Sequence, residues 1–80
     1  MNREEVFERL NKVFREILND DTIELHDETV AEDVEGWDSY EFINLIEGVE
    51  QEFGIKIPMT IVVAMKNVGE MADIILELGK

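Results

Sequence analysis

Residues 38–54 read DSYEFINLIEGVEQEFG and carry both the periodicity and the end signals of one amphipathic helix. Apolar side chains recur there at helical spacing and form a single stripe: Phe42, Leu45, Ile46, Val49 and Phe53. Asp38 or Ser39 can cap the start, because both side chain types accept a hydrogen bond from a free first-turn amide. Gly54 can end the helix, because a glycine readily adopts the left-handed backbone conformation that is common just after a helix. We therefore expect a helix from about Ser39 to Phe53.

A second amphipathic pattern precedes this helix, over about residues 3–19. Its apolar positions again follow the helical period: Val6, Phe7, Leu10, Val13, Phe14, Ile17 and Leu18. Asn2 with Glu5 three positions later indicates a capping box, and the run from Asn19 to Asp21 is a plausible stop.

The segment after Gly54 predicts one short and one longer helix. Pro58 disfavours helix at the residue before it, so residues 55–58 form an extended link. We expect Thr60 to cap a short helix that reaches about Met65. Its β-branched content would equally suit a strand, but no second strand is available to pair with it. The last helix starts near Asn67, where Glu70 completes a second capping box, and its inward stripe follows the helical period: Met71, Ile74, Ile75 and Leu78.

Residues 20–38 show no sustained period and predict a long loop. Ile23, Leu25 and Val34 are the residues expected to anchor it to the body, and residues 33–37 read as a turn into the next helix. The predicted fold class is therefore all-α: a single domain over residues 1–80, built as a small four-helix bundle with three longer helices and one short one.

Charge is the strongest compositional signal. Twenty acidic residues against seven basic ones give a formal charge of −13, which argues against nucleic-acid binding. From Glu16 to Ile55, both included, there are fourteen Asp or Glu residues and no Lys or Arg. This surface is either a solvated face that maintains solubility or a one-signed surface that steers basic partners.

Other compositional features narrow the class of protein. With no cysteine, neither disulfides nor thiolate metal sites are available. No segment is apolar for long enough to span a bilayer, and the charged N-terminus lacks the pattern of a signal peptide. We expect a cytoplasmic monomer with no membrane insertion. No stretch of the acidic region fits the calcium-binding loop pattern, so no metal site is predicted.

Candidate chemistry is sparse. His26 is the only histidine, and a Ser39–His26–Asp27 nucleophile system is conceivable, but Ser39 lacks the glycines of a nucleophile elbow. Asp38 and Ser39 are more simply explained as helix-capping residues. The same position also suits a phosphate ester, because the amides and dipole at a helix N-terminus stabilise an anion.

The run from Asp33 to Pro58 resembles the acyl carrier protein family. That family has an Asp-Ser-Leu site that opens an acidic helix, which closes with Glu-x-x-Phe, a short link and Ile-Pro. The resemblance implies that a phosphopantetheinyl transferase attaches the 4'-phosphopantetheine of coenzyme A to Ser39, with Asp38 as the flanking motif residue. Acyl groups are then carried as thioesters on the thiol of that arm, so the chain would be a carrier with no catalytic residue of its own.

The resemblance also implies where partners and cargo would lie. Acyl-transferring and acyl-modifying enzymes with basic docking patches would contact the helix that Ser39 opens, at Tyr40, Glu41, Glu47 and Glu50. A transient cavity for the acyl chain would be lined by Phe42, Ile46, Val63 and Ile75.

Three residues depart from the pattern of fatty-acid carriers. Tyr40 replaces the usual Leu, Asn44 stands where an acid is common, and Trp37 resembles specialised stand-alone carriers. Fatty-acid, polyketide and related lipid biosynthesis all stay open, whereas the Gly-Gly-His-Ser pattern of peptidyl carriers is absent. The main alternative is an unmodified acidic interaction module, which needs only the charged face and an apolar groove. The remaining alternative is a small hydrolase that would use Ser39 and His26.

Overall fold

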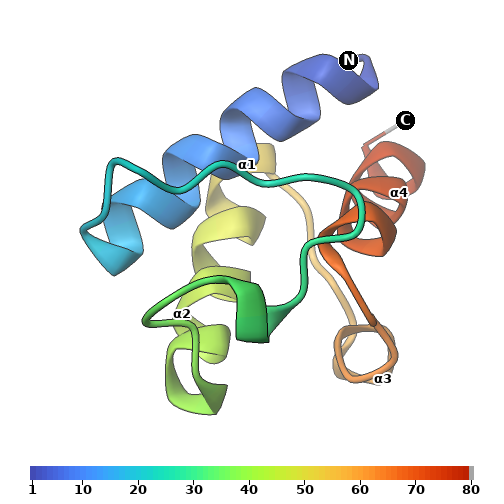
Figure 1. The fold of residues 1–80 in the computed structure, drawn as a ribbon. Helices are drawn as coiled ribbons and strands as arrows, with labels where there is room; N and C mark the ends of the chain where they lie inside the picture. Colours follow the sequence, from blue (N-terminus) through green and yellow to red (C-terminus); the bar gives the residue numbers. More distant parts are fainter. Residues whose placement is uncertain (80) are drawn as a thin grey trace.

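The computed structural model describes residues 1–79, which form four α-helices and one 3-10 helix (Figure 1). In chain order the elements are α1 (Arg3–Leu18), η1 (Ala31–Asp33), α2 (Ser39–Phe53), α3 (Met59–Val62) and α4 (Val68–Leu78). A long loop joins α1 to α2, and no strand occurs among the described residues. The predicted all-α fold, with three longer helices and one short one, is confirmed.

Each of the three long helices begins where a side chain caps it. The capping side chain accepts a hydrogen bond from the amide three residues later, at 2.8 or 2.9 Å: Asn2 from Glu5, Asp38 from Glu41 and Asn67 from Glu70. The N-cap of α2 is thus Asp38, and Ser39 is its first helical residue. The left-handed end predicted at Gly54 is present, with a φ angle of 66°, and the stop predicted at Asn19 is also left-handed, with a φ angle of 53°.

The short helix α3 differs from its prediction at both ends. It begins at Met59 and ends at Val62, one turn in all, rather than running from a Thr60 cap to Met65. The carbonyl of Pro58 accepts hydrogen bonds from the amides of both Ile61 and Val62, so the turn starts directly after the proline. The φ that a proline fixes is compatible with a helix start, and within residues 1–79 no side chain caps α3.

The loop between α1 and α2 is ordered by a feature that its sequence did not reveal. Asp33 accepts a hydrogen bond from the amide of Val30 at 3.0 Å and donates its own amide to the Val30 carbonyl at 2.9 Å, which closes η1. The predicted anchors Ile23 and Leu25 are buried, and Val34 is half-buried. The loop therefore forms one wall of the molecule.

Helix α1 packs against both α2 and α4 across a shared apolar core. The fully buried side chains come from all three helices: Phe14, Leu10, Leu45, Met71, Ile75, Val6, Val49 and Val68. Gly48 lets α1 and α2 approach closely, since a Cβ at that position would lie 2.5 Å from Ile17 Cδ1. At the far end of α2, Arg9 donates to Glu52 at 2.8 Å and stacks over the Phe53 ring.

Candidate functional site

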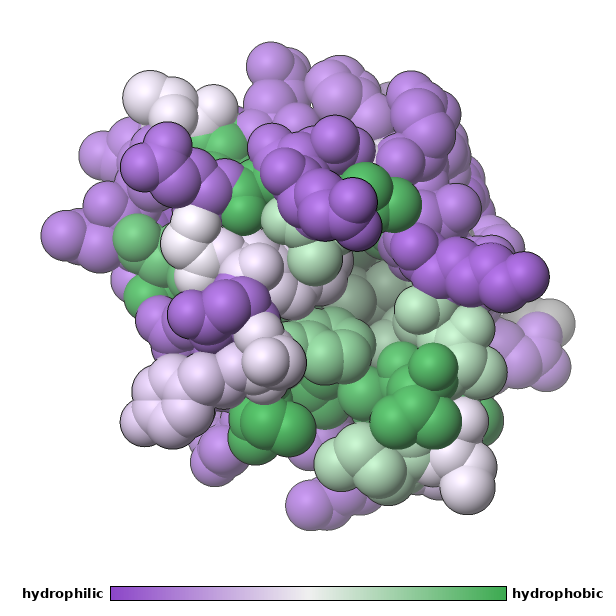
Figure 2. Space-filling model, turned by 60° about the horizontal axis from the view of Figure 1, so that its bottom comes forward, coloured by the Kyte–Doolittle hydropathy of each residue, from purple (hydrophilic) through white to green (hydrophobic). Residues whose placement is uncertain are grey.

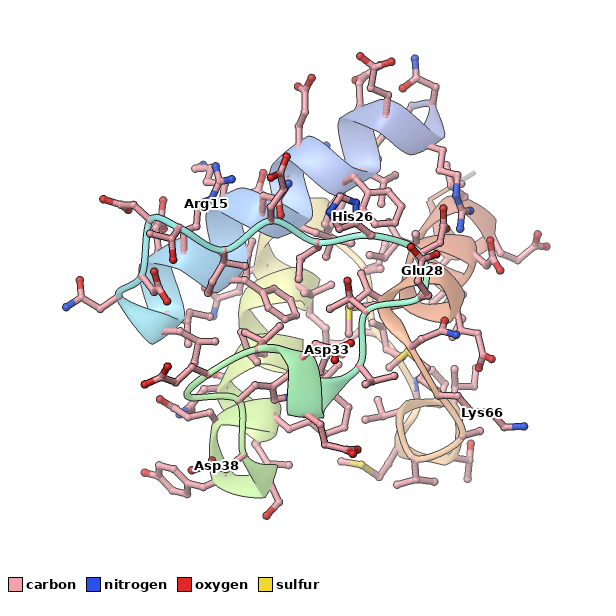
Figure 3. The ribbon with its side chains drawn as sticks, viewed as in Figure 1. Arg15, His26, Glu28, Asp33, Asp38 and Lys66 are labelled. Carbon is pink, nitrogen blue, oxygen red and sulfur yellow. The ribbon has the colours of Figure 1, made fainter. Side chains whose placement is uncertain are left out.

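Ser39 lies exposed at the first position of α2, at one end of the bundle. Figure 3 marks this end by the label of Asp38, the residue before it. Ser39 is the only serine of the chain, and within residues 1–79 its hydroxyl has no hydrogen-bond partner. A free, accessible hydroxyl is what a transfer reaction at this residue requires.

The backbone around Ser39 favours a negatively charged substituent. Asp38 is occupied by the Glu41 amide, while the amides of Ser39 and Tyr40 make no hydrogen bond within residues 1–79. Free first-turn amides and the positive end of the helix dipole stabilise a phosphate. The arrangement suits a phosphate ester on the Ser39 hydroxyl.

A cavity of about 290 Å³ opens beside Ser39. It lies between the start of α2, η1 and the segment that joins α3 to α4, and its lining is mostly apolar: Val30, Ala31, Trp37, Asp38, Ser39, Phe42, Met65, Lys66, Asn67 and Met71. Trp37 forms part of the wall, with its ring edge-on to Phe14 at 5.1 Å and tilted against Phe42 at 5.9 Å. An apolar chain that starts at Ser39 would find a sheltered surface here.

Of the four residues expected to line an acyl cavity, Phe42 lines the cavity beside Ser39. Ile46 and Ile75 are part of the closed core instead. Val63 is 73 % exposed, because the single turn of α3 buries Val62 and leaves the next residue outside. Apart from Asp38 and Ser39, which were expected at the attachment site, the remaining lining residues were not identified as site residues from the sequence. Trp37, directly before Asp38, is the one that its position could have indicated.

The residues expected to contact partners are not equally free. Tyr40 is 79 % exposed and Glu47 is also exposed. Glu41 is half-buried and accepts a hydrogen bond from the Asn44 side chain at 2.7 Å. Glu50 accepts one from the Ile57 amide at 2.7 Å, so its carboxylate holds the link that follows α2. Tyr40 and Glu47 are therefore the more available pair.

Apolar side chains gather on the face that carries the start of α2 and α3. Figure 2 shows this face hollowed and apolar, with hydrophilic side chains along its edge. Four of the large hydrophobic residues exposed to solvent belong to these two helices or follow them directly: Tyr40, Ile43, Met59 and Val63. We call these four residues the apolar face. Exposed apolar clusters of this kind are typical of interaction surfaces.

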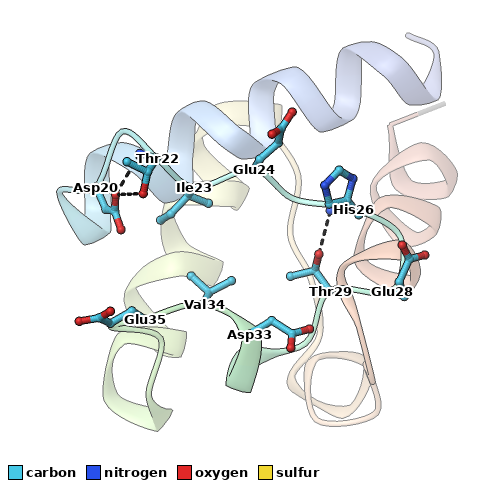
Figure 4. A pocket seen from close by; sticks show the side chains of 10 residues that line it. All are labelled: Asp20, Thr22, Ile23, Glu24, His26, Glu28, Thr29, Asp33, Val34 and Glu35. Atoms are coloured by element: carbon cyan, nitrogen blue, oxygen red, sulfur yellow. Dashed lines mark hydrogen bonds between the residues drawn. The ribbon is translucent and has the colours of Figure 1, made fainter.

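A second, larger hollow of about 530 Å³ lies along the loop between α1 and α2 (Figure 4). It contains His26, whose backbone amide donates to the Thr29 hydroxyl at 2.8 Å. His26 is far from the Asp38 end of α2 in Figure 3, and within residues 1–79 no hydrogen bond joins it to Ser39. The geometry gives no support to a Ser39–His26 nucleophile system.

The acidic residues of this hollow do not converge. Among the described residues, no group of three or more acidic or histidine side chains could hold a metal ion. Hydrogen bonds from the Thr22 hydroxyl and then from the Thr22 amide lower the pKa of Asp20 below its usual range. The hollow thus has the character of a solvated acidic surface.

Comparisons with known proteins agree on one family. Residues 8–75 match the family model described as "Phosphopantetheine attachment site". An acyl carrier protein of Saccharopolyspora erythraea is 27 % identical over 78 residues, which cover 98 % of this chain and 82 % of that protein. The solution NMR structure of holo acyl carrier protein from Geobacter metallireducens superposes with a TM-score of 0.85 at 36 % identity, covering 91 % of this chain and 84 % of that one. Over residues 1–79, none of the helices has the length and apolar character needed to cross a bilayer.

Proposed function

This chain belongs to the phosphopantetheine-attachment-site family of acyl carrier domains, and on that premise we propose that Ser39 is its attachment residue. The protein is an acyl carrier with a phosphopantetheine prosthetic group. One observation carries the assignment of the residue: the only serine of the chain is exposed at the start of α2, and its hydroxyl has no hydrogen-bond partner within residues 1–79.

The residues around Ser39 fit a phosphate ester. Asp38 keeps the first turn of α2 closed by accepting from the Glu41 amide at 2.8 Å. The amides of Ser39 and Tyr40, which make no hydrogen bond within residues 1–79, could bind the phosphate oxygens of the ester. When bound, the prosthetic group supplies the thiol on which acyl groups are held as thioesters. The chain itself contributes position and recognition, and we propose that it catalyses no reaction.

The cavity beside Ser39 is the proposed shelter for the acyl chain. Phe42, Trp37 and the flexible side chains of Met65 and Met71 offer an apolar lining that can adapt to different chains. Ile46 and Ile75 belong to the hydrophobic core and are not among the residues that line it. We propose that the cargo is an intermediate of fatty-acid, polyketide or related lipid biosynthesis.

Carriers of this family interact with phosphopantetheinyl transferases and acyl-handling enzymes. We propose that such enzymes dock on the apolar face, with Glu47 and Glu41 at its acidic edge. Buried apolar contacts supply most of the affinity at an interface, while edge charges mainly set the association rate. A partner surface with an apolar centre and basic residues around it is therefore complementary to the apolar face and its acidic edge. In this proposal Val63 is a docking residue and not a cavity residue.

A monomeric, cytoplasmic chain with residues 1–80 as one domain stays our prediction. Residue 80 lies outside the described part of the structure.

Incubation with coenzyme A, magnesium and a broad-specificity transferase tests the attachment site. Intact-mass measurement should show one added phosphopantetheine on the wild type and none on Ser39→Ala. Tyr40→Phe and Thr60→Ala remove other hydroxyls from exposed residues of the same end and should be modified in full. A wild type that stays unmodified with several transferases, yet still captures a basic partner, would instead identify an acidic interaction module.

A further inference from the structure

The loop between α1 and α2 is fastened to the start of α4 by a compact set of contacts. The Gly69 amide donates to the Asp27 carbonyl at 2.8 Å, and the Val68 amide donates to the Thr29 carbonyl at 2.9 Å. These are two of the first amides of α4, which have no acceptor within their own helix. Figure 1 shows the loop turning back beside α4 at this point. We call the junction between residues 27–29 and residues 68–69 the loop seam.

Arg3 closes the loop seam from outside. Its guanidinium donates to the Asp27 carboxylate, to the Asp73 carboxylate at 2.6 Å and to the Gly69 carbonyl at 3.2 Å. One side chain from α1 thus joins the loop and α4. A planar guanidinium has enough donors for three such acceptors, whereas a lysine does not present them in the same fixed geometry.

Gly69 makes the close contact sterically possible. A Cβ at this position would lie 2.7 Å from the Asp27 carbonyl oxygen and 3.2 Å from the Asp27 Cα. Both are backbone atoms, so an alanine could be accepted only if the loop itself moved away. The glycine is therefore required by the seam and not by the helix that contains it.

The loop side and the α4 side of the loop seam each continue into a wall of the cavity beside Ser39. Directly after Thr29, the loop contributes Val30 and Ala31 to the lining. On the other side, Asn67 and Met71 flank the seam residues of α4. The separation of these walls is consequently fixed at the seam, a few residues from the cavity itself.

We propose that Arg3 and Gly69 are positioning residues that set the width of the cavity beside Ser39, and thereby the size of acyl group that it shelters. The second half of this inference rests on the proposed function. The first half concerns the unmodified chain alone. Loosening the seam should let the wall formed by Val30 and Ala31 retreat, so that the cavity widens and Trp37 becomes more accessible.

The unmodified full-length chain provides the first test. Trp37 is the only tryptophan and lines the cavity, so quenching of its fluorescence by neutral acrylamide reports on the wall. Gly69→Ala and Arg3→Ala should raise the quenching constant and speed hydrogen exchange at the Val68 and Gly69 amides by about fivefold or more. Arg3→Lys should fall between Arg3→Ala and the wild type.

Two substitutions serve as matched controls. Gly48→Ala also crowds a helical glycine, but against side chains of α1 instead of the loop. Arg9→Ala removes a similarly exposed α1 arginine that pairs with Glu52, away from the seam. Both controls should have the same Trp37 quenching constant as the wild type and the same rate of hydrogen exchange at the Val68 and Gly69 amides. Circular dichroism should confirm that Gly69→Ala and Arg3→Ala are folded. If the quenching constant of Trp37 in these two variants is no higher than in the controls, the seam does not position the wall.

Loading with acyl groups of increasing length provides the second test. In the wild type, the rise in melting temperature caused by the acyl chain should peak at one length, and in Gly69→Ala and Arg3→Ala the peak should move to longer chains. A variant that merely weakened the fold would lower the melting temperature by the same amount at every acyl-chain length. The peak would then stay at the wild-type length, which would overturn the proposal. Failure of Ser39 to accept any group would refute the proposed function, while the quenching and exchange results would still decide the role of the seam.

Discussion

Removal of the α2 cap by Asp38→Ala should weaken both the fold and the presentation of Ser39. The Asp38 carboxylate accepts from the Glu41 amide at 2.8 Å, and its loss leaves that amide without a partner in the first turn. Loss of an N-cap costs about 1 kcal/mol, which lowers the melting temperature of a domain of this size by about 4–8 °C. If the weakened turn frays with a similar free energy, the fraction of chains with a formed site, and so the transferase rate, falls by up to about fivefold.

Two substitutions separate capping from other effects. Asp38→Asn keeps the cap but removes the charge, so its melting temperature should stay near that of the wild type. Asn2→Ala removes the equivalent cap of α1 and should cost similar stability without slowing modification. Melting is followed by circular dichroism and modification by intact mass under limiting transferase. If Asp38→Ala has the melting temperature of the wild type, the argument that Asp38 caps α2 is refuted. If Asn2→Ala slows modification as much as Asp38→Ala does, the argument that the α2 cap acts locally on Ser39 is refuted.

Three other predictions concern charge and docking. The hydrogen bond from Arg9, helped by the charge of Lys12, lowers the pKa of Glu52 below its ordinary value of 4.5. The loss of stability caused by Arg9→Ala should therefore be at its full size above pH 4.5 and should fade as the pH falls through the depressed folded-state pKa of Glu52. A loss of the same size above and below that pKa would contradict this. With a net charge of −13, added salt should raise the melting temperature by screening repulsion, and a flat or falling response would count against a crowded acidic surface. Ile43→Ser and Val63→Ser should each weaken transferase binding by about fivefold or more at any ionic strength, whereas Glu47→Gln should slow association only at low salt; the reverse pattern would disprove docking through the apolar face.

The elements with strong local signals were predictable from sequence. Asn2 and Asn67 cap helices as expected, Asp38 is the cap of α2 among the two candidates Asp38 and Ser39, and Gly54 ends α2 in the left-handed conformation. In each case the determining interaction lies within four residues, so the sequence pattern contains it. The burial of Ile23 and Leu25 followed from the need of isolated apolar residues in a polar loop to reach the core.

Features that depend on tertiary contacts were not predictable in the same way. Val63, which the family resemblance implied as a cavity residue, is 73 % exposed and is not among the residues that line the cavity beside Ser39. The cavity itself joins residues 30–31 to residues 65–71, which no local period relates. Gly69 illustrates the point most clearly, since its requirement arises from a backbone atom 42 positions earlier, the Asp27 carbonyl.

Mapping the modification within the chain tests the central claim most directly. After reaction with coenzyme A and a transferase, the protein is digested and the peptide that spans residues 33–58 is sequenced by tandem mass spectrometry. We predict that the phosphopantetheine mass resides on Ser39 alone. Its presence on Tyr40 or a threonine, with Ser39 unmodified, would contradict the assignment.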